Sequence, residues 1–140
     1  AEEGKTLPIT DSRMTRFMIS LEQGVELVWQ AFNDMDGGEI YVKKIPSMKI
    51  TDIGKAIGPN SKLEIIGIRP GEKLHEQMIG LEDAHYTYEY ENYYKILPSI
   101  RFWGGEKFKI GEGVKVPENF TYSSETNSDW MTIKQLQSYL

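Results

Sequence analysis

The chain has 140 residues, 39% of them hydrophobic and 26% charged, and this balance is typical of a folded domain rather than a disordered one. A net charge of −5 gives no general attraction to nucleic acid or to an anionic membrane, and no apolar run is long enough to span a bilayer, so neither partner is expected. The absence of cysteine excludes disulfides and thiolate metal sites and fits a cytoplasmic protein.

The first predicted elements are an extended segment and a long helix. Residues 1–5 read as a helix end stopped by Gly4, which favours a piece of a longer protein over a frayed terminus. Leu7–Thr10 is extended, and Ser20 with Gln23 forms a capping box for a helix from about Leu21 to Met35. One apolar face follows helical spacing through Phe17, Leu21, Val25, Val28, Trp29 and Phe32.

The next stretch alternates strands with a short helix. Glu39–Ile45 and Lys62–Ile68 are predicted strands, and between them Thr51 is the expected N-cap of a helix that closes at Gly58. Helices that alternate with strands predict an α/β fold.

The second half starts with a turn at Arg69–Glu72, after which Lys73–Met78 and Glu82–Ala84 are expected to be helical turns. Tyrosines at alternate positions from Tyr86 to Tyr90 predict a strand that pairs with Tyr93–Leu97 as a hairpin.

The last part of the chain is predicted to be mostly loops. Residues 98–117 are rich in glycine and lysine, and neither glycine pair among them matches a phosphate-binding loop. Thr132 and Gln135 then form a second capping box, which predicts a short helix with Ile133, Leu136 and Leu140.

Two arginines beside turn signals are the candidate ligands of a phosphate group. Arg16 precedes the long helix, and Arg69 follows a strand and precedes Pro70-Gly71-Glu72. Guanidinium groups grip phosphate oxygens with paired, charge-assisted hydrogen bonds, so two of them can clamp a diphosphate. Glu72 is placed to accept hydrogen bonds from ribose hydroxyls. The alternative is that both arginines form ordinary surface ion pairs.

Two other sequence patterns, a partial zinc-protease motif and a stripe of tyrosines, could also mark a functional site. His75-Glu76 begins like a zinc-protease motif, but Ile79 stands where the second histidine belongs, so His75 is interpreted as a structural or loop residue and no metal is expected. The tyrosine stripe is either a platform for sugar stacking or, as we favour, a hairpin with one face on the core.

Four strings in this chain resemble a known family. They are Leu7-Pro8-Ile9-Thr10-Asp11 with Met14-Thr15-Arg16-Phe17, Gly38-Glu39-Ile40, Lys44-Ile45-Pro46-Ser47-Met48-Lys49-Ile50, and Gly67-Ile68-Arg69-Pro70-Gly71-Glu72-Lys73-Leu74-His75-Glu76, and the tail from Tyr122 to Trp130 agrees with them. Together they resemble the UDP-N-acetylglucosamine 4,6-dehydratases of the extended short-chain dehydrogenase/reductase superfamily. The closest group is the inverting type, which starts pseudaminic acid synthesis for flagellin glycosylation.

The resemblance implies that residues 1–140 are a C-terminal, UDP-sugar-binding portion. It implies the last strands and helices of a Rossmann-type fold together with a small substrate-binding lobe. In the family an N-terminal Rossmann portion binds NADP and carries the catalytic lysine and tyrosine. Neither G-x-x-G-x-x-G nor Y-x-x-x-K occurs in this sequence, so no catalytic residue is expected here and the chain alone is expected to be inactive.

The resemblance also assigns roles to single residues. Arg16 and Arg69 would bind the UDP diphosphate, and Glu72 would bind the uridine ribose. Leu7, Pro8 and Ile9 would flank the uracil, and Thr15 would support Arg16. The full-length enzyme is expected to be a homo-oligomer in the cytoplasm.

Two alternatives remain open. One is a UDP-N-acetylglucosamine epimerase of capsule synthesis, which belongs to the same superfamily and would use the same two arginines. The other is a binding or interaction module without catalytic activity.

Overall fold

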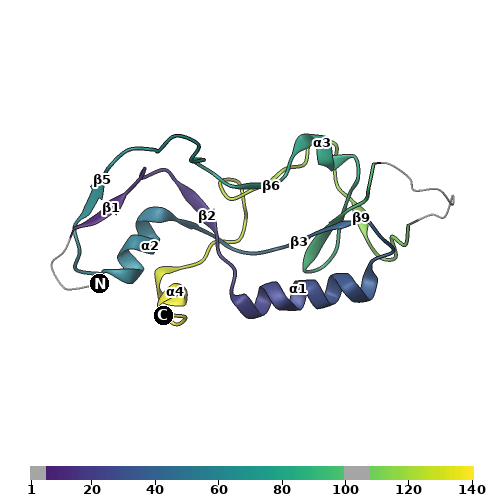
Figure 1. Cartoon of the computed structure of the whole chain (residues 1–140), viewed down its shortest axis with the longest axis horizontal. Coiled ribbons are helices and arrows are strands. Elements are labelled where there is room, and N and C mark those ends of the chain that lie inside the picture. Colours follow the sequence, from purple (N-terminus) through teal and green to yellow (C-terminus); the bar gives the residue numbers. More distant parts are fainter. Residues whose placement is uncertain (1–5, 100–107) are drawn as a thin grey trace. The chain divides into compact units, whose positions relative to one another are not determined.

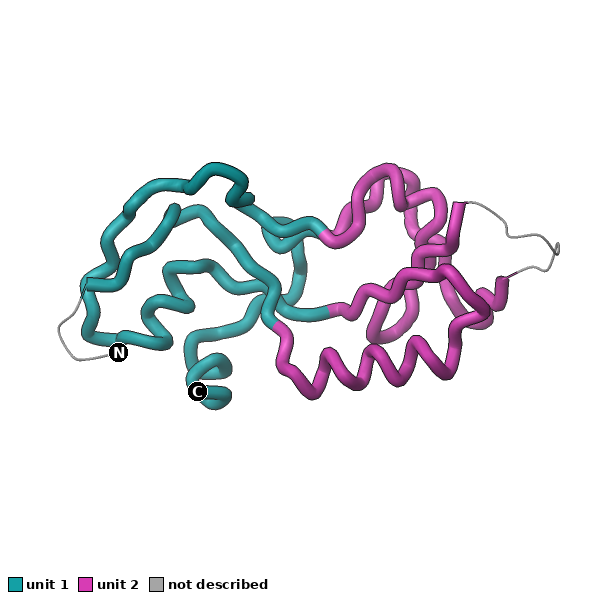
Figure 2. Tube along the Cα trace, viewed as in Figure 1, with its two compact units in different colours: residues 1–18, 45–77, 123–140 teal, residues 19–44, 78–122 magenta. Residues whose placement is uncertain are grey.

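The computed structural model describes residues 6–99 and 108–140, and its elements form an α/β fold with parallel and antiparallel strand pairs (Figure 1). The predicted fold class is therefore confirmed. The chain divides into two compact units, each assembled from separate stretches of sequence (Figure 2). Unit 1 comprises residues 1–18, 45–77 and 123–140, and unit 2 comprises residues 19–44 and 78–122.

Unit 1 contains a short parallel strand pair. Strand β1 (Leu7–Ile9) pairs in parallel with β5 (Leu63–Ile65), and helix α2 (Ile50–Ile57) lies in the connection that a parallel pair requires. A Cβ atom on Gly54 of α2 would lie 3.1 Å from the side chain of Ile9. Glycine at this position therefore lets the helix pack closely on the strand.

A second, antiparallel pair in unit 1 carries the first candidate arginine. Strand β2 (Thr15–Phe17) pairs with β4 (Ser47–Lys49), which leads directly into α2. Helix α4 (Ile133–Gln137) completes the core of the unit. This core consists of the buried residues Met48, Ala56 and Leu136, against which Met18, Ile53, Met131 and Ile133 pack. Met48 of this core lies on β4 directly opposite Arg16 of β2, so the core anchors the strand pair that carries Arg16.

Unit 2 is built on a four-stranded antiparallel sheet. Its strands follow the order β3 (Ile40–Lys43), β8 (Tyr93–Ile96), β7 (Thr87–Glu89) and β9 (Val114–Lys115). All four residues of β8 are buried. The predicted hairpin is confirmed. The burial of Tyr93 and Tyr94 agrees with the core interpretation of the tyrosine stripe, but Tyr88 and Tyr90 are only half-buried and Tyr86 is exposed.

The centre of this sheet holds a buried ammonium group. Lys95 is 1% exposed, and its Nζ lies 2.5 Å from Asp34 and donates to the carbonyl of Lys109 at 3.2 Å. The same atom lies over the rings of Tyr41 and Tyr90, 5.5 and 5.2 Å from their centroids. The hydroxyl of Tyr41 also donates to Asp34, at 2.8 Å. Charge pairing, hydrogen bonds and ring faces together compensate for removing the cation from water.

Asp34 predicts a sensitivity to acid. Burial acts to raise its pKa, but hydrogen bonds from Lys95 and Tyr41 and the nearby ammonium charge hold the pKa below its ordinary value of 3.8. A carboxyl whose pKa is lowered by folding adds stability above its unfolded pKa of about 3.9, and the gain disappears as the pH falls through the folded value. We expect the free energy of unfolding to decline below about pH 5, and to decline less steeply for Asp34→Asn. Urea midpoints across this range measure the two slopes, and equal slopes would contradict the assignment.

Helix α1 (Leu21–Asp34) has the predicted capping box, with Ser20 accepting from the amide of Gln23 and Gln23 accepting from the amide of Ser20. Its predicted apolar face is present, but no residue of the helix is buried. Leu21 is 80% exposed and Trp29 65% exposed. Phe17, which was assigned to this face, instead belongs to strand β2, so that assignment is wrong.

Two further predictions of local structure are wrong. Helix α2 begins at Ile50 after the extended residue Lys49, and no side chain caps it, so Thr51 is not the N-cap. The segment Lys73–Met78 is not a helical turn. Its end enters strand β6 (Gln77–Ile79), which pairs with β10 (Tyr122–Ser123).

The remaining predictions are confirmed in part. Helix α3 (Leu81–Ala84) covers the second predicted helical turn, and Thr132 and Gln135 form the capping box of α4. Of the predicted loop region 98–117, residues 100–107 lie outside the described part, and the loop prediction is wrong at Val114–Lys115, which form β9. The helix end predicted at residues 1–5 also lies outside the described part. No described helix has both the length and the hydropathy that crossing a bilayer requires.

Candidate functional site

Both candidate arginines belong to unit 1, but their guanidinium groups have different surroundings. Arg16, on β2, donates from Nη1 to the carbonyls of Thr15 at 2.7 Å and Leu74 at 3.2 Å, and from Nη2 to the carbonyl of Lys73 at 2.9 Å. Its Nε lies 3.5 Å from the carboxylate of Glu76. Arg16 therefore attaches β2 to the segment 73–76, which follows directly after the turn that carries Arg69.

The turn at Arg69 is closed by its own backbone and by Glu72. The amide of Glu72 donates to the carbonyl of Arg69 at 3.1 Å, and the amide of Arg69 donates to the Glu72 carboxylate at 3.0 Å. Gly71 has φ = 83°, which together with Pro70 at the preceding position matches a type II turn. Thr10 donates to the other carboxylate oxygen of Glu72 at 3.4 Å. Glu72 thus fixes the shape of the turn and joins it to the end of β1.

The Arg69 side chain projects from this turn and is exposed. Among residues 6–99 and 108–140 the structure gives it no hydrogen-bond or ion-pair partner. A guanidinium with free donors on a fixed turn is suited to bind a phosphate or carboxylate. The described residues therefore leave Arg69, rather than Arg16, with the freer set of donors for an incoming anion.

The predicted uracil-flanking residues divide by burial. Ile9 is buried against α2, Leu7 is half-buried and Pro8 is exposed. The carbonyl of Ile9 is already used, since it accepts from the amide of Ile66 at 2.8 Å. Of the three side chains, Pro8 offers the most accessible surface to a ligand, and Ile9 serves the core.

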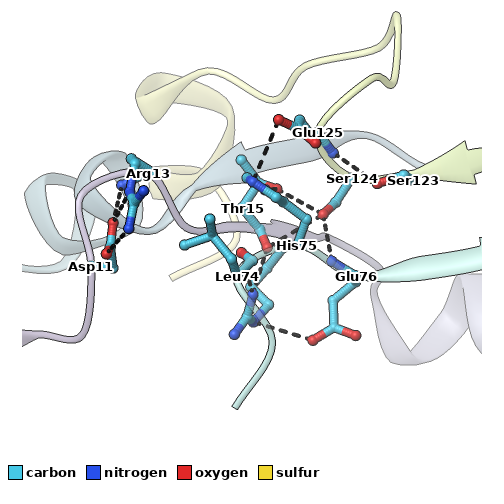
Figure 3. A network of polar contacts seen from close by, with 10 residues as sticks. Asp11, Arg13, Thr15, Leu74, His75, Glu76, Ser123, Ser124 and Glu125 are labelled. Atoms are coloured by element: carbon cyan, nitrogen blue, oxygen red, sulfur yellow. Dashed lines mark hydrogen bonds and ion pairs between the residues drawn. The ribbon is translucent and has the colours of Figure 1, made fainter. Parts of the chain in front are cut away.

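Thr15 lies at the centre of a polar network that sequence reasoning did not find (Figure 3). Its hydroxyl lies 2.8 Å from Nδ1 of His75 and 2.7 Å from Oγ of Ser124. Nε2 of His75 faces Glu125 at 3.5 Å. Because a hydroxyl can both donate and accept, Thr15 can bond to Nδ1 of His75 and to Ser124 at the same time.

No signal in the sequence marks this network, because its members are 60 and 109 residues apart along the chain. The interpretation of His75 as a structural or loop residue agrees with its hydrogen bond to Thr15. Thr15 is 3% exposed and Ser124 0% exposed, so neither hydroxyl is accessible as a nucleophile. The network holds three segments together and does not form a catalytic triad open to substrate.

Near this network, Asp11 and Arg13 form a pair of their own (Figure 3). Nε and Nη2 of Arg13 donate to the two carboxylate oxygens of Asp11 at 3.0 and 2.8 Å. These hydrogen bonds, and one from the amide of Arg13, lower the pKa of Asp11 to about 2. Arg13 is therefore committed to its neighbour and differs from Arg69 in this respect. Within the described residues no group of three or more histidine, cysteine, aspartate or glutamate side chains is arranged to hold a metal ion.

Comparisons with known proteins agree with the sequence motifs. The chain is 55% identical, over 97% of its length, to the UDP-N-acetylglucosamine 4,6-dehydratase (inverting) of Campylobacter jejuni. It is 38% identical, over 99% of its length, to the UDP-glucose 4-epimerase of Rickettsia canadensis. The chain spans 42% of each of these relatives.

A solved structure has the same fold. The X-ray structure of Pen from Bacillus thuringiensis superposes with a TM-score of 0.75 at 23% identity and covers 96% of this chain and 39% of its own. Residues 1–98 match the family described as polysaccharide biosynthesis protein. The family match covers more than half of the sequence, so this chain belongs to the polysaccharide biosynthesis protein family.

Proposed function

We propose that this chain is the nucleotide-sugar-binding portion of a UDP-N-acetylglucosamine 4,6-dehydratase. The observation that carries the proposal is the 55% identity, over nearly the whole chain, to a relative of that name. Since the chain spans 42% of that relative, the enzyme would be a longer protein of which these residues form one part.

The role of these residues would be to hold UDP in a fixed position. Within the described residues the Arg69 guanidinium has no partner, Glu72 closes the turn that carries it, and Arg16 fixes the segment that follows. In this proposal Arg69 grips the diphosphate and Glu72 accepts from the ribose, and Arg16 joins the diphosphate site through its remaining donor capacity. Binding energy from the nucleotide would orient the sugar for the reaction.

The described residues do not fit a dinucleotide cofactor. The parallel strands of unit 1 are followed by no glycine-rich loop of the dinucleotide-binding pattern. NADP, when bound, supplies a hydride acceptor and donor, and we assign it to the portion of the enzyme outside these residues. The proposal extends to a homo-oligomeric enzyme in the cytoplasm that serves surface-polysaccharide or flagellin-glycan synthesis through pseudaminic acid. The family resemblance supports these points.

An epimerase is the second candidate, and the 38% identity to a UDP-glucose 4-epimerase favours it. The two reactions give different products, because a dehydratase removes water from the sugar and an epimerase keeps its mass. The UDP-binding residues described above would serve either enzyme.

Product analysis of the full-length protein tests the proposal. Incubation with UDP-N-acetylglucosamine and NADP+ is expected to give a nucleotide sugar lighter by one water, detected by mass spectrometry. The 140-residue chain alone serves as the control and is expected to give no turnover, since the residues that hold the cofactor lie elsewhere. A product of unchanged mass with a new configuration at C4 would establish the epimerase instead. No product and no UDP binding would refute both.

A further inference from the structure

We infer that Ser124 is a positioning residue of the UDP site, acting through Thr15 and Glu76 on the segments that carry the two arginines. The inference rests on the proposed function. Ser124 lies on the stretch 123–140, far along the chain from either arginine, and touches neither guanidinium in the described contacts.

Ser124 first fixes the backbone at Glu76. The amide of Ser124 donates to the carbonyl of Glu76 at 2.8 Å, and the amide of Glu76 donates to the Ser124 hydroxyl at 2.9 Å (Figure 3). The two bonds hold the backbone of Glu76 through both its N–H and its C=O group. Glu76 ends the segment that starts at the Arg69 turn, so Ser124 fixes the far end of that segment.

Ser124 also fixes Thr15 on β2. Its hydroxyl lies 2.7 Å from the Thr15 hydroxyl and 3.3 Å from the Thr15 carbonyl. That carbonyl is one of the three that accept hydrogen bonds from the Arg16 guanidinium. One buried hydroxyl therefore contacts both segments that Arg16 joins.

Replacing Ser124 by alanine removes the acceptor of the part-buried Glu76 amide and the partner of the buried Thr15 hydroxyl. The segments would remain packed through the core and through Arg16, but their spacing would loosen. A loss of positioning is expected to weaken the binding of UDP and UDP-sugar and to leave the bound cofactor and the chemical step largely intact. If Ser124 served folding alone, its loss would instead reduce UDP binding, cofactor binding and the rate of the chemical step together.

The test compares Ser124→Ala with its neighbour Ser123→Ala in the full-length protein. Ser123 also carries a hydroxyl, which accepts from Glu125 at 3.4 Å and makes no described bond to β2. We expect Ser124→Ala to raise the Kd for UDP and the KM for UDP-N-acetylglucosamine about fivefold, as for one lost hydrogen bond, with kcat and the Kd for NADP+ within about twofold. Ser123→Ala is expected to match the unsubstituted protein. Isothermal titration and initial rates measure both.

A second pair of variants removes the ambiguity of misfolding. Thr15→Ser keeps the hydroxyl that Ser124 contacts, and Thr15→Val removes it at nearly constant volume. Thr15→Ser should bind UDP more tightly than Thr15→Val, which should resemble Ser124→Ala. Provided that the unsubstituted protein binds UDP, three results would overturn the inference. The first is an unchanged Kd for UDP in folded Ser124→Ala, and the second is a parallel loss of UDP and NADP+ binding in that variant. The third is an equal Kd for UDP in the two Thr15 variants. If the unsubstituted protein binds no UDP, the proposed function fails first and the inference falls with it.

Discussion

Replacing Asp34 with alanine is expected to lower the free energy of unfolding by about 2–3 kcal/mol, because it leaves the buried Lys95 ammonium without its charge partner. Lys95 keeps one carbonyl and two ring faces, which compensate only partly. The expected loss is smaller than the roughly 3–5 kcal/mol of a fully buried pair, since the side chain of Asp34 is 37% exposed. Urea denaturation followed by tryptophan fluorescence gives the value.

The matched control is Lys95→Met, which removes the cation and retains most of the side-chain volume. Asp34 would remain partly hydrated and would keep the hydrogen bond from Tyr41, so the cost is expected to be clearly smaller. The double variant Asp34→Ala/Lys95→Met should recover stability relative to Asp34→Ala alone. If all three variants have the same urea midpoint as the unsubstituted protein, the pair contributes nothing to folding.

Arg69→Ala is expected to weaken UDP-sugar binding by the full-length protein about 10-fold or more, the equivalent of losing a charge-assisted contact of ~1.5–3 kcal/mol. The affinity of Arg69→Lys for the UDP-sugar should lie between those of Arg69→Ala and the unsubstituted protein, since an ammonium keeps the charge but cannot form the paired hydrogen bonds of a guanidinium. Stability should not change, because among the described residues the side chain has no partner to lose.

Arg13→Ala provides the control for charge. It removes the same unit charge from the same unit, but Arg13 is committed to Asp11 and its side chain is 70% exposed. Its Kd for UDP is expected to stay within about twofold of the unsubstituted protein. Equal Kd values for Arg69→Ala and the unsubstituted protein would remove Arg69 from the site, and equal losses in both variants would reduce the effect to general electrostatics.

The features predicted correctly from sequence are those that local contacts determine. The capping boxes at Ser20 and Thr132 lie within a single helical turn, and the tyrosine hairpin joins neighbouring stretches. The errors occur where hydrogen bonds to residues far away in the sequence determine the backbone conformation. Residues 73–76 accept hydrogen bonds from Arg16 and pair with Ser124, more than 45 residues away in each case, and a helical propensity cannot compete with these bonds.

The candidate site follows the same division. The turn at Arg69 was predictable because proline and glycine encode it, and the structure gives Gly71 the positive φ that such a turn demands. The three backbone carbonyls that accept from Arg16 were not predictable. Neither was the contact between the buried hydroxyls of Thr15 and Ser124, since nothing in the sequence marks the hydrogen-bond partner of a serine or threonine. Strand β4 was missed for the same reason, because its pairing with β2 spans about 30 residues of chain.

The assembly of unit 1 from three stretches of sequence has a consequence for the order of folding. Thr15 and Ser124 are 109 residues apart, and loop closure over such a distance is slow compared with the formation of a hairpin. During synthesis the hairpin of unit 2 can form while the first two stretches of unit 1 still lack their third. The surface that we propose to bind the nucleotide is therefore expected to form last, after the ribosome has released the segment that contains Ser124.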